Sequence, residues 1–206
     1  MKPRFKRDDF KLIADDTRYD GHFAIHDLTL QHQRYEGGWS EPYQRECLVR
    51  SDSVAVVPYD PQQDSIVLIE QLRIGCVRAP AMNPFLLEIV AGCIEADEVP
   101  AAVAVRELQE ETGLVGRAVE RICDFWTTPG GCTERTHLYY AIVDASLAGG
   151  VHGLVHEEEN ILSYVLPAQT VFDMVAHGEI CSAISLVGLQ WLALNHQRIR
   201  QQWQEQ

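Results

Sequence analysis

The sequence of 206 residues predicts an α+β fold, a mixed α/β sandwich of sheet and helices. Two observations support this class. Short apolar runs bounded by turn residues indicate several strands along most of the chain. Apolar residues at helical spacing occur in three segments, one central and two near the C-terminus, and these are interspersed with the strands without strict alternation.

The first fifty residues predict a small antiparallel sheet. Apolar and polar side chains alternate over residues 22–30, and a second such patch covers residues 45–50. Residues 36–39, Glu-Gly-Gly-Trp, have the composition of a turn between them. We therefore expect a small N-terminal β region over residues 1–50 and a main domain over residues 51–206.

The main domain is expected to begin with a hairpin. Residues 53–58 and 65–70 are apolar runs, and Asp-Pro-Gln-Gln-Asp at 60–64 separates them. Further strands are predicted at 86–90, 121–126, 137–143 and 161–166. Helices are predicted at 100–111, with Pro100 in the first turn and Gly113 as C-cap, at 168–177 and at 182–202. In the last helix we expect one buried stripe, formed by Ile184, Val187, Trp191 and Leu194.

Composition excludes several classes of function. The chain has 17 Lys and Arg against 30 Asp and Glu, a formal net charge of -13, which disfavours nucleic acid and anionic membranes as partners. It contains no apolar run long enough to span a bilayer, and its basic start lacks the apolar core of a secretory signal. The six cysteines form no C-x-x-C pair. We expect a cytoplasmic protein with reduced thiols.

The central helix carries the most informative residues. Glu107 and Glu111 are four residues apart and share one helical face, and Glu110 borders it. Like charges so close need a neutralising cation, and carboxylate oxygens suit Mg²⁺ or Mn²⁺. Arg106 is placed to pair with Glu110 one turn later. The alternative interpretation is a solvated acidic helix face.

The whole segment from Gly92 to Leu114 fits the pattern G-x5-E-x7-R-E-U-x-E-E-x-G-U, where U is apolar. It resembles the Nudix box, a loop-helix-loop that binds divalent metals in the Nudix hydrolases. The resemblance implies a Nudix-type α/β/α sandwich and a Mg²⁺ cofactor, with Mn²⁺ as a substitute. It also implies metal and catalytic roles for Glu107 and Glu111, with the Ala91 carbonyl as a further ligand and Glu110 as an accessory ligand.

Segments outside the box are similar to the bacterial ADP-ribose pyrophosphatase branch of that family. They are Glu-Gln-Leu-Arg at 70–73, Leu-Glu-Ile-Val-Ala-Gly at 87–92, Thr-Pro-Gly-Gly at 128–131, the acidic loop at 153–161 and the C-terminal helix around 183–192. In this branch the general base lies in the acidic loop. Alignment on Ile161 favours Glu157 as base and Glu159 as metal ligand, but a shift of one residue, involving Glu158, stays open.

The resemblance also implies residues that contact substrate. Arg73 is expected to contact a phosphate or the terminal ribose, with a salt-bridged surface arginine as the alternative, and Arg50 and Arg135 are weaker candidates of the same kind. Trp39 is expected to stack on adenine, or else to be a core or dimer contact. Glu88 and Gly131, the latter in a loop that would shape the ribose pocket, complete the expected substrate-binding set.

The function implied is Mg²⁺-dependent hydrolysis of ADP-ribose to AMP and ribose 5-phosphate. Other nucleoside diphosphate sugars, such as GDP-mannose or ADP-glucose, are alternative substrates, because the box does not specify the sugar. A sensor that binds ADP-ribose without cleaving it is a further alternative, although every box carboxylate is present. The resemblance also implies a homodimer with exchanged N-terminal strands, in which the β region over residues 1–50 serves dimerisation and substrate contact.

Overall fold

The computed structural model describes residues 2–204 of the chain. They divide into two compact units. The first comprises Met1–Ser51 with the loop Thr128–Glu134, and the second comprises Asp52–Thr127 with Arg135–Gln206. The loop is therefore grouped with the N-terminal residues although it interrupts the sequence of the second unit.

The first unit is a three-stranded antiparallel sheet of β1 (Phe10–Asp20), β2 (Ala24–His32) and β3 (Tyr43–Val49), in that order. Strands β2 and β3 confirm the strands predicted at 22–30 and 45–50, and they pair antiparallel from Ala24↔Val49 to Leu30↔Tyr43. Gly37 and Gly38 both have positive φ in the predicted turn, a conformation that favours glycine. Strand β1 was not predicted, because its charged residues interrupt the alternation of apolar and polar side chains.

The second unit is built on a mixed sheet with the strand order β10-β11-β5-β4-β9-β8, to which β6 and β7 add by pairing with β5 and β4. The strands are β4 (Ser53–Asp60), β5 (Ser65–Leu72), β6 (Phe85–Glu88), β7 (Val90–Cys93), β8 (Ala118–Trp126), β9 (Arg135–Ile142), β10 (Gly150–His152) and β11 (Ile161–Pro167). Strand β4 runs parallel to β9, and the other pairs are antiparallel. All of β4 is buried, as its unbroken apolar run predicts.

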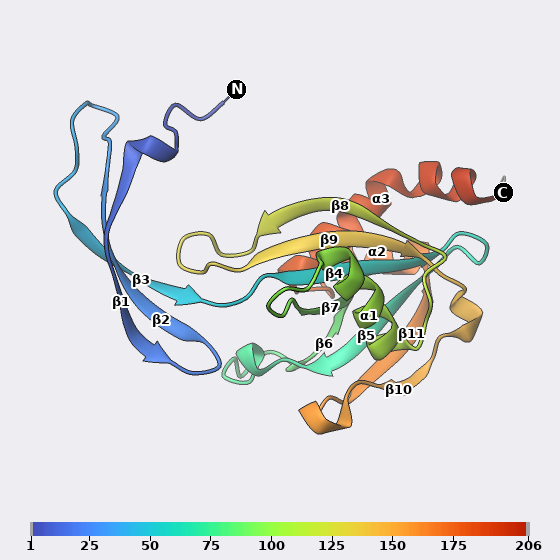
Figure 1. Ribbon diagram of the computed structural model, residues 1–206. Coiled ribbons are helices and arrows are strands. Elements are labelled where there is room, and N and C mark those ends of the chain that lie inside the picture. The colour runs from blue at the N-terminus through green and yellow to red at the C-terminus, as the bar shows by residue number, and fades with distance from the viewer. Residues whose placement is uncertain (1, 205–206) are drawn as a thin grey trace. The chain divides into compact units, whose positions relative to one another are not determined.

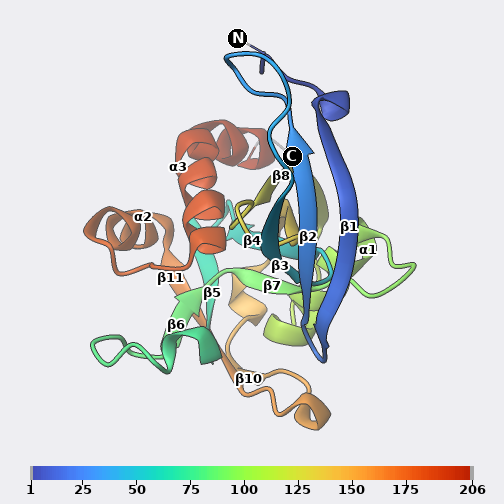
Figure 2. The ribbon, with the colours of Figure 1, turned by 90° about the vertical axis from the view of Figure 1, so that its left-hand side faces the viewer.

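Helices cover both faces of this sheet, so the predicted α/β/α sandwich is confirmed (Figures 1 and 2). Alternate residues of β4 show the two faces. Val54 and Val56 belong to the core cluster that includes residues of α1 (Pro100–Thr112). Ala55 and Val57 belong to the cluster under α2 (Ala168–His177) and α3 (Ala183–Gln204). Among residues 2–204, no helix is long and apolar enough to cross a membrane.

The hairpin of β4 and β5 opens into a fork. The two strands pair only beside their turn, at Tyr59↔Ile66 and Asp60↔Ser65. Farther along, β6 pairs with β5 and β7 pairs with β4, so the chain moves from one arm to the other between Glu88 and Val90. The single strand predicted at 86–90 is therefore wrong, because Ile89 interrupts it.

The buried stripe predicted for the last helix is also wrong in part. Leu194 is 87% exposed and Val187 is exposed as well, whereas Leu189, Leu192 and Ile199 are fully buried. Small residues explain the difference. Ser185 and Gly188 let this side of α3 approach the sheet closely, so Leu189 and Leu192 are the residues that pack in the core.

Candidate active site

The box helix α1 presents its carboxylates to the sheet. Pro100 occupies its first turn, and Gly113 ends it with φ 71° and an N–H bond of 2.8 Å to the Gln109 carbonyl. The four-residue spacing puts Glu107 and Glu111 on the face that packs toward β7, where they are 9% and 3% exposed. Glu110 lies at the edge of this face and is half-buried.

Strand β7 receives both carboxylates. The Ala91 N–H donates to Glu111 Oε2 at 3.0 Å. The next residue, Gly92, lies directly under the Glu107 carboxylate, which a Cβ at that position would overlap. An extended residue presents its N–H and C=O to the same edge of its strand, so the Ala91 carbonyl lies on the side of α1 as well.

Burial makes both glutamates poor at holding negative charge. It raises the pKa of Glu107 to about 7, and repulsion from Glu110 and Glu159 adds to this while the Arg106 charge opposes it. Burial also raises the pKa of Glu111 well above its ordinary value. The bond from Ala91 and the charge of Arg73 lower that pKa, and the charges of Glu107 and Glu159 raise it further.

Arg106 binds the outer side of this cluster. Its Nη1 is 2.9 Å from Glu107 Oε1 and 2.8 Å from Glu110 Oε2, so the predicted pairing with Glu110 is confirmed. Its Nη2 is 3.4 Å from Glu98, which also accepts a bond of 2.9 Å from the Glu95 N–H. Glu98 thus links the loop before the helix to Arg106.

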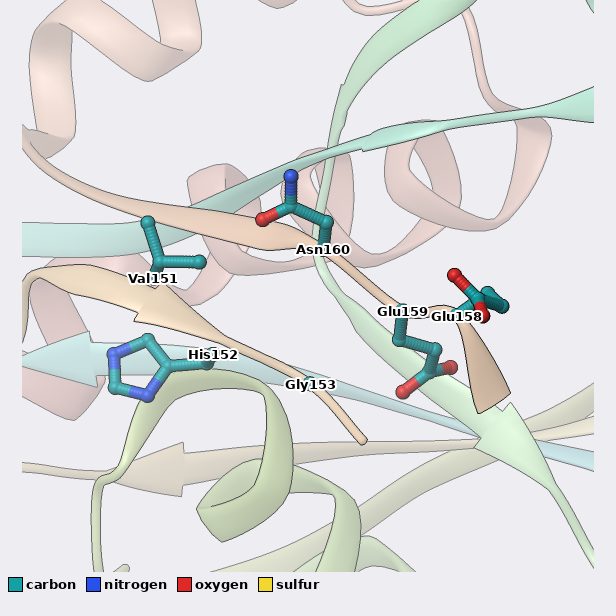
Figure 3. Close-up of a pocket in the computed structure, with 6 residues that line it drawn as sticks. All are labelled: Val151, His152, Gly153, Glu158, Glu159 and Asn160. Carbon is teal, nitrogen blue, oxygen red and sulfur yellow. The ribbon is translucent and has the colours of Figure 1, made fainter. Parts of the chain in front are cut away.

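The acidic loop supplies further carboxylates. The Gly153 N–H donates to the Glu110 carbonyl at 3.2 Å, which ties the start of the loop to the end of α1. Glu159 Oε2 accepts a bond of 3.2 Å from the Leu154 N–H. Glu158 has φ 56°, and Figure 3 shows its carboxylate pointing away from that of Glu159. Glu158 and Glu159 both line a neighbouring hollow of about 320 Å³ beside His152 (Figure 3).

These groups surround one cavity of about 210 Å³. It is lined by Arg73, Ala91, Gly92, Cys93, Glu95, Arg106, Glu107, Glu110, Leu154, Glu157 and Glu159. The predicted base, metal ligands and phosphate-binding arginine therefore come together, with Glu111 buried beside Ala91. Of the two loop carboxylates in this cavity, Glu157 is the more accessible, with a side chain that is 55% exposed. Glu95 was not predicted, because a loop glutamate has no spacing that assigns it to a site.

Arg73 is a cation that lines this cavity together with the box residues. It follows β5, and its Nε donates to Glu88 at the end of β6. Glu88 is 6% exposed, so a buried carboxylate fixes the guanidinium. Arg73 therefore forms a salt bridge and also lines the cavity. Glu88, which was expected to contact substrate, binds Arg73 instead and is not among the residues that line the cavity.

The donor set of the cavity fits a divalent cation that prefers oxygen. Several carboxylates line it together with a backbone carbonyl, and burial raises the pKa of Glu107 and Glu111, so a nearby cation would favour their ionised forms. Within residues 2–204, no three His, Cys, Asp or Glu side chains form a complete metal-binding group. Arg106 forms ion pairs with two of the predicted ligands, Glu107 and Glu110.

Arg135, in the same unit, is not brought to this cavity. Its guanidinium binds Asp52 through Nε at 3.1 Å and Nη2 at 2.8 Å, and its N–H donates to the same carboxylate at 3.1 Å. Asp52 also lies 3.4 Å from Nε2 of His137, a residue that is buried between Asp52 and Asp124. The guanidinium thus belongs to a charged network at the start of β9.

The remaining predicted residues lie in the first unit. The Lys11 ammonium lies 4.2 Å from the centroid of the half-buried Trp39 ring. Arg50 is 3.5 Å from Glu134 and 5.0 Å from the Phe23 ring. The Gly131 carbonyl accepts a bond of 2.8 Å from the Leu48 N–H, and Gly131 lines a hollow of about 180 Å³ with Leu28, Leu30 and Cys47. Pro129, Gly130 and Cys132 of the same loop also line this hollow.

Comparisons with known proteins agree with this geometry. The NUDIX domain model matches residues 49–178. ADP-ribose pyrophosphatases of Haemophilus influenzae and Escherichia coli are each 37% identical over 97% of this chain, which covers 93% and 95% of their lengths. A GDP-mannose pyrophosphatase of Cronobacter sakazakii is 32% identical, over 89% of this chain and 95% of its own. The crystal structure of an ADP compounds hydrolase shares the fold, with TM-score 0.67, 18% identity and coverage of 89% and 94%.

Proposed function

The chain belongs to the NUDIX family, and we propose that it hydrolyses the pyrophosphate bond of ADP-ribose, releasing AMP and ribose 5-phosphate. The observation that carries this proposal is one cavity that is lined by Arg73 together with carboxylates of α1 and of the acidic loop. A diphosphate needs cations on its oxygens and a base near the attacking water, and the cavity contains donors for both.

The proposed reaction is attack of water on one phosphorus, with cleavage of the P–O–P bridge. Glu157 takes the proton from the water, a role that suits a side chain exposed to solvent and placed on the cavity wall. Arg73, held by the buried Glu88, binds a phosphate oxygen and orients the diphosphate. Glu107, Glu111, Glu110, Glu159 and the Ala91 carbonyl would hold the metal.

We propose Mg²⁺ as the physiological cofactor, with Mn²⁺ as a substitute, because both accept an all-oxygen donor set. When bound, such an ion neutralises charge on the diphosphate and makes water more acidic. A bound ion would compete with Arg106 for Glu107 and Glu110. The raised pKa of both buried glutamates supports this, since a second positive charge would stabilise their ionised forms.

ADP-ribose is the proposed substrate because the relatives that share 37% identity are named for it, whereas the GDP-mannose pyrophosphatases share 29 to 32%. The test is a panel of ADP-ribose, ADP-glucose and GDP-mannose with Mg²⁺ or with a chelator, read as phosphate released by a coupled phosphatase. We expect ADP-ribose to give the highest kcat/KM. A preference for another sugar would refute the substrate, and full turnover in chelator would refute the metal.

The roles within the acidic loop give a second test. Glu157→Gln should lower kcat strongly with little change in KM, because it removes the proton acceptor. Glu159→Gln should raise the Mg²⁺ concentration needed for half-maximal rate, because its carboxylate faces the metal-binding glutamates. Glu158→Gln is the matched control, since the Glu158 carboxylate points away from that of Glu159 (Figure 3). If Glu158→Gln or Glu159→Gln produced the kcat effect instead, the assignment of Glu157 would be wrong.

For the N-terminal unit we propose dimerisation by exchange of its strands and contact with substrate from Trp39, Arg50 and Gly131. Exposed apolar residues on the edge strand β1, Leu12 and Ile13, support a partner on this sheet. Arg135 stays a candidate contact that would need to exchange Asp52 for a phosphate. We further propose a cytoplasmic location, supported by the cysteine pattern of the sequence.

A further inference from the structure

Ser185 of α3 forms a hydrogen bond at the point where the chain crosses the fork of the sheet. Its Oγ accepts the N–H of Ile89 at 3.1 Å. Ile89 lies between the last residue of β6 and the first of β7, and it belongs to neither ladder. Ile89 and Ser185 are each 1% exposed, so water cannot replace this bond.

The helix is shaped to reach this amide. Gly188 follows Ser185 on the same side of α3, and a Cβ there would lie 2.8 Å from Val57 Cγ2 and 2.9 Å from Ile89 Cδ1. The absence of a side chain therefore lets α3 pack directly on Ile89. Ser185 supplies the acceptor and Gly188 the space, so together they fix the position of one residue of the crossing.

Residues on both sides of Ile89 hold the chemical groups of the cavity. Glu88, immediately before it, binds Arg73. Ala91, two residues after it, donates to Glu111, and Gly92 lies under the Glu107 carboxylate. A shift of Ile89 would therefore move the substrate-binding arginine and the metal-binding glutamates relative to each other.

We propose that Ser185 is a positioning residue for the hydrolysis, acting through Ile89 on the carboxylates that hold the metal. The inference deepens the proposed function and rests on it. Ser185 does not line the cavity and touches no reacting atom; it acts from the opposite face of the sheet. Groups that orient metal ligands commonly affect metal affinity and rate as much as they affect stability.

The experiment compares the whole protein with Ser185→Ala, Ser185→Cys and Ser65→Ala. Ser65 is the matched control, because it is a buried serine (5% exposed) of the same sheet whose hydroxyl makes no hydrogen bond within the described residues. Three quantities are measured: hydrogen exchange of the Ile89 amide, the Mn²⁺ concentration that half-saturates the protein without substrate, and kcat with KM for ADP-ribose.

For Ser185→Ala we expect loss of protection at Ile89, a rise of about tenfold in the half-saturating Mn²⁺ concentration, and a similar fall in kcat, as for other residues that support metal ligands. KM should change little. Ser185→Cys should lie between Ser185→Ala and wild type, because sulfur is a weaker acceptor. Ser65→Ala should match wild type in all three measurements.

Fast exchange of the Ile89 amide in the wild-type protein would overturn the proposal. The proposal would also be overturned if Ser185→Ala or Ser185→Cys had the same Mn²⁺ affinity and kcat as Ser65→Ala. If Ser185→Ala does not fold, Ser185→Cys and the wild-type exchange rate decide. If the wild type does not cleave ADP-ribose, the proposed function fails, but the exchange and Mn²⁺ measurements still test the positioning role. The two failures are thus distinguishable.

Discussion

Replacing Glu107 by Gln should stabilise the metal-free protein at high pH while abolishing turnover. The pKa of Glu107 is about 7 in the folded protein against 4.5 for an ordinary glutamate, so the folded state binds its proton more tightly than the unfolded state does. The free energy of unfolding therefore falls as the pH rises from 4.5 to 7, and the full loss is present above 7. Gln has no ionised form and escapes this loss.

The expected size follows from the two pKa values. Their difference corresponds to about 3 kcal/mol in the free energy of unfolding. This figure already includes the opposing attraction of Arg106, which lowers the pKa of Glu107. The gain at pH 8 is therefore about 3 kcal/mol, or roughly 6–12 °C in Tm for a chain of this length. Near pH 4.5 the gain should vanish.

The assay is thermal unfolding in chelator at pH 8 and at pH 4.5, with Glu179→Gln as control, since that variant removes one negative charge at an exposed glutamate. Adding Mg²⁺ at pH 8 should raise the Tm of wild type more than that of Glu107→Gln, because the ion binds the ionised carboxylate. A Glu107→Gln protein that is less stable than wild type at pH 8, or a difference that does not depend on pH, would refute the reasoning.

Two further substitutions separate activity from stability. Gly92→Ala should lower kcat/KM about a hundredfold, because displacing a metal-binding carboxylate misplaces the reacting groups. The Tm should change little, because the new Cβ displaces only the end of the Glu107 side chain. A large fall in Tm together with the fall in kcat/KM would contradict this. Asp64→Asn should lower the free energy of unfolding by about 1–3 kcal/mol at pH 7. It removes the charge that accepts from His196 at 2.6 Å and Tyr59 at 2.9 Å, while Asn tolerates φ 53°. Burial raises the pKa of Asp64, but these partners outweigh burial and lower it. The stabilisation by the Asp64 carboxylate should therefore be lost as the pH falls through the lowered pKa, which urea unfolding at several pH values would measure. A loss of stability in Asp64→Asn that does not depend on pH would contradict this.

The sequence was sufficient for the elements whose signal is local. Pro100 and Gly113 predicted the two ends of α1, and the four-residue spacing placed Glu107 and Glu111 on one face. These features depend only on residues within a few turns of each other. The fold class followed because the apolar runs and helical segments are clearly separated.

What the sequence could not predict depends on contacts between distant segments. The break at Ile89 lies inside an apolar run, and only the change of partner from β5 to β4 shows it. On α3, apolar residues occur all around the helix, so periodicity alone predicted that Leu194 is buried. In the structure Leu192 is buried and Leu194 is exposed. The pairing of Arg73 with Glu88 likewise depends on the register of β5 and β6, which no spacing along the chain specifies.

The fork in the sheet explains why one cavity contains both a phosphate-binding cation and metal-binding carboxylates. Arg73 follows the β5 arm, and Ala91 and Gly92 belong to the β4 arm. A closed hairpin would place β4 and β5 side by side and leave no edge on either arm. Because the arms separate, β6 can pair with β5 and β7 can pair with β4. The single residue Ile89 then connects the arm that precedes Arg73 to the arm that receives the glutamates of α1. The opposed charges are therefore a consequence of the strand topology, and the box helix completes the arrangement by packing on the β4 arm.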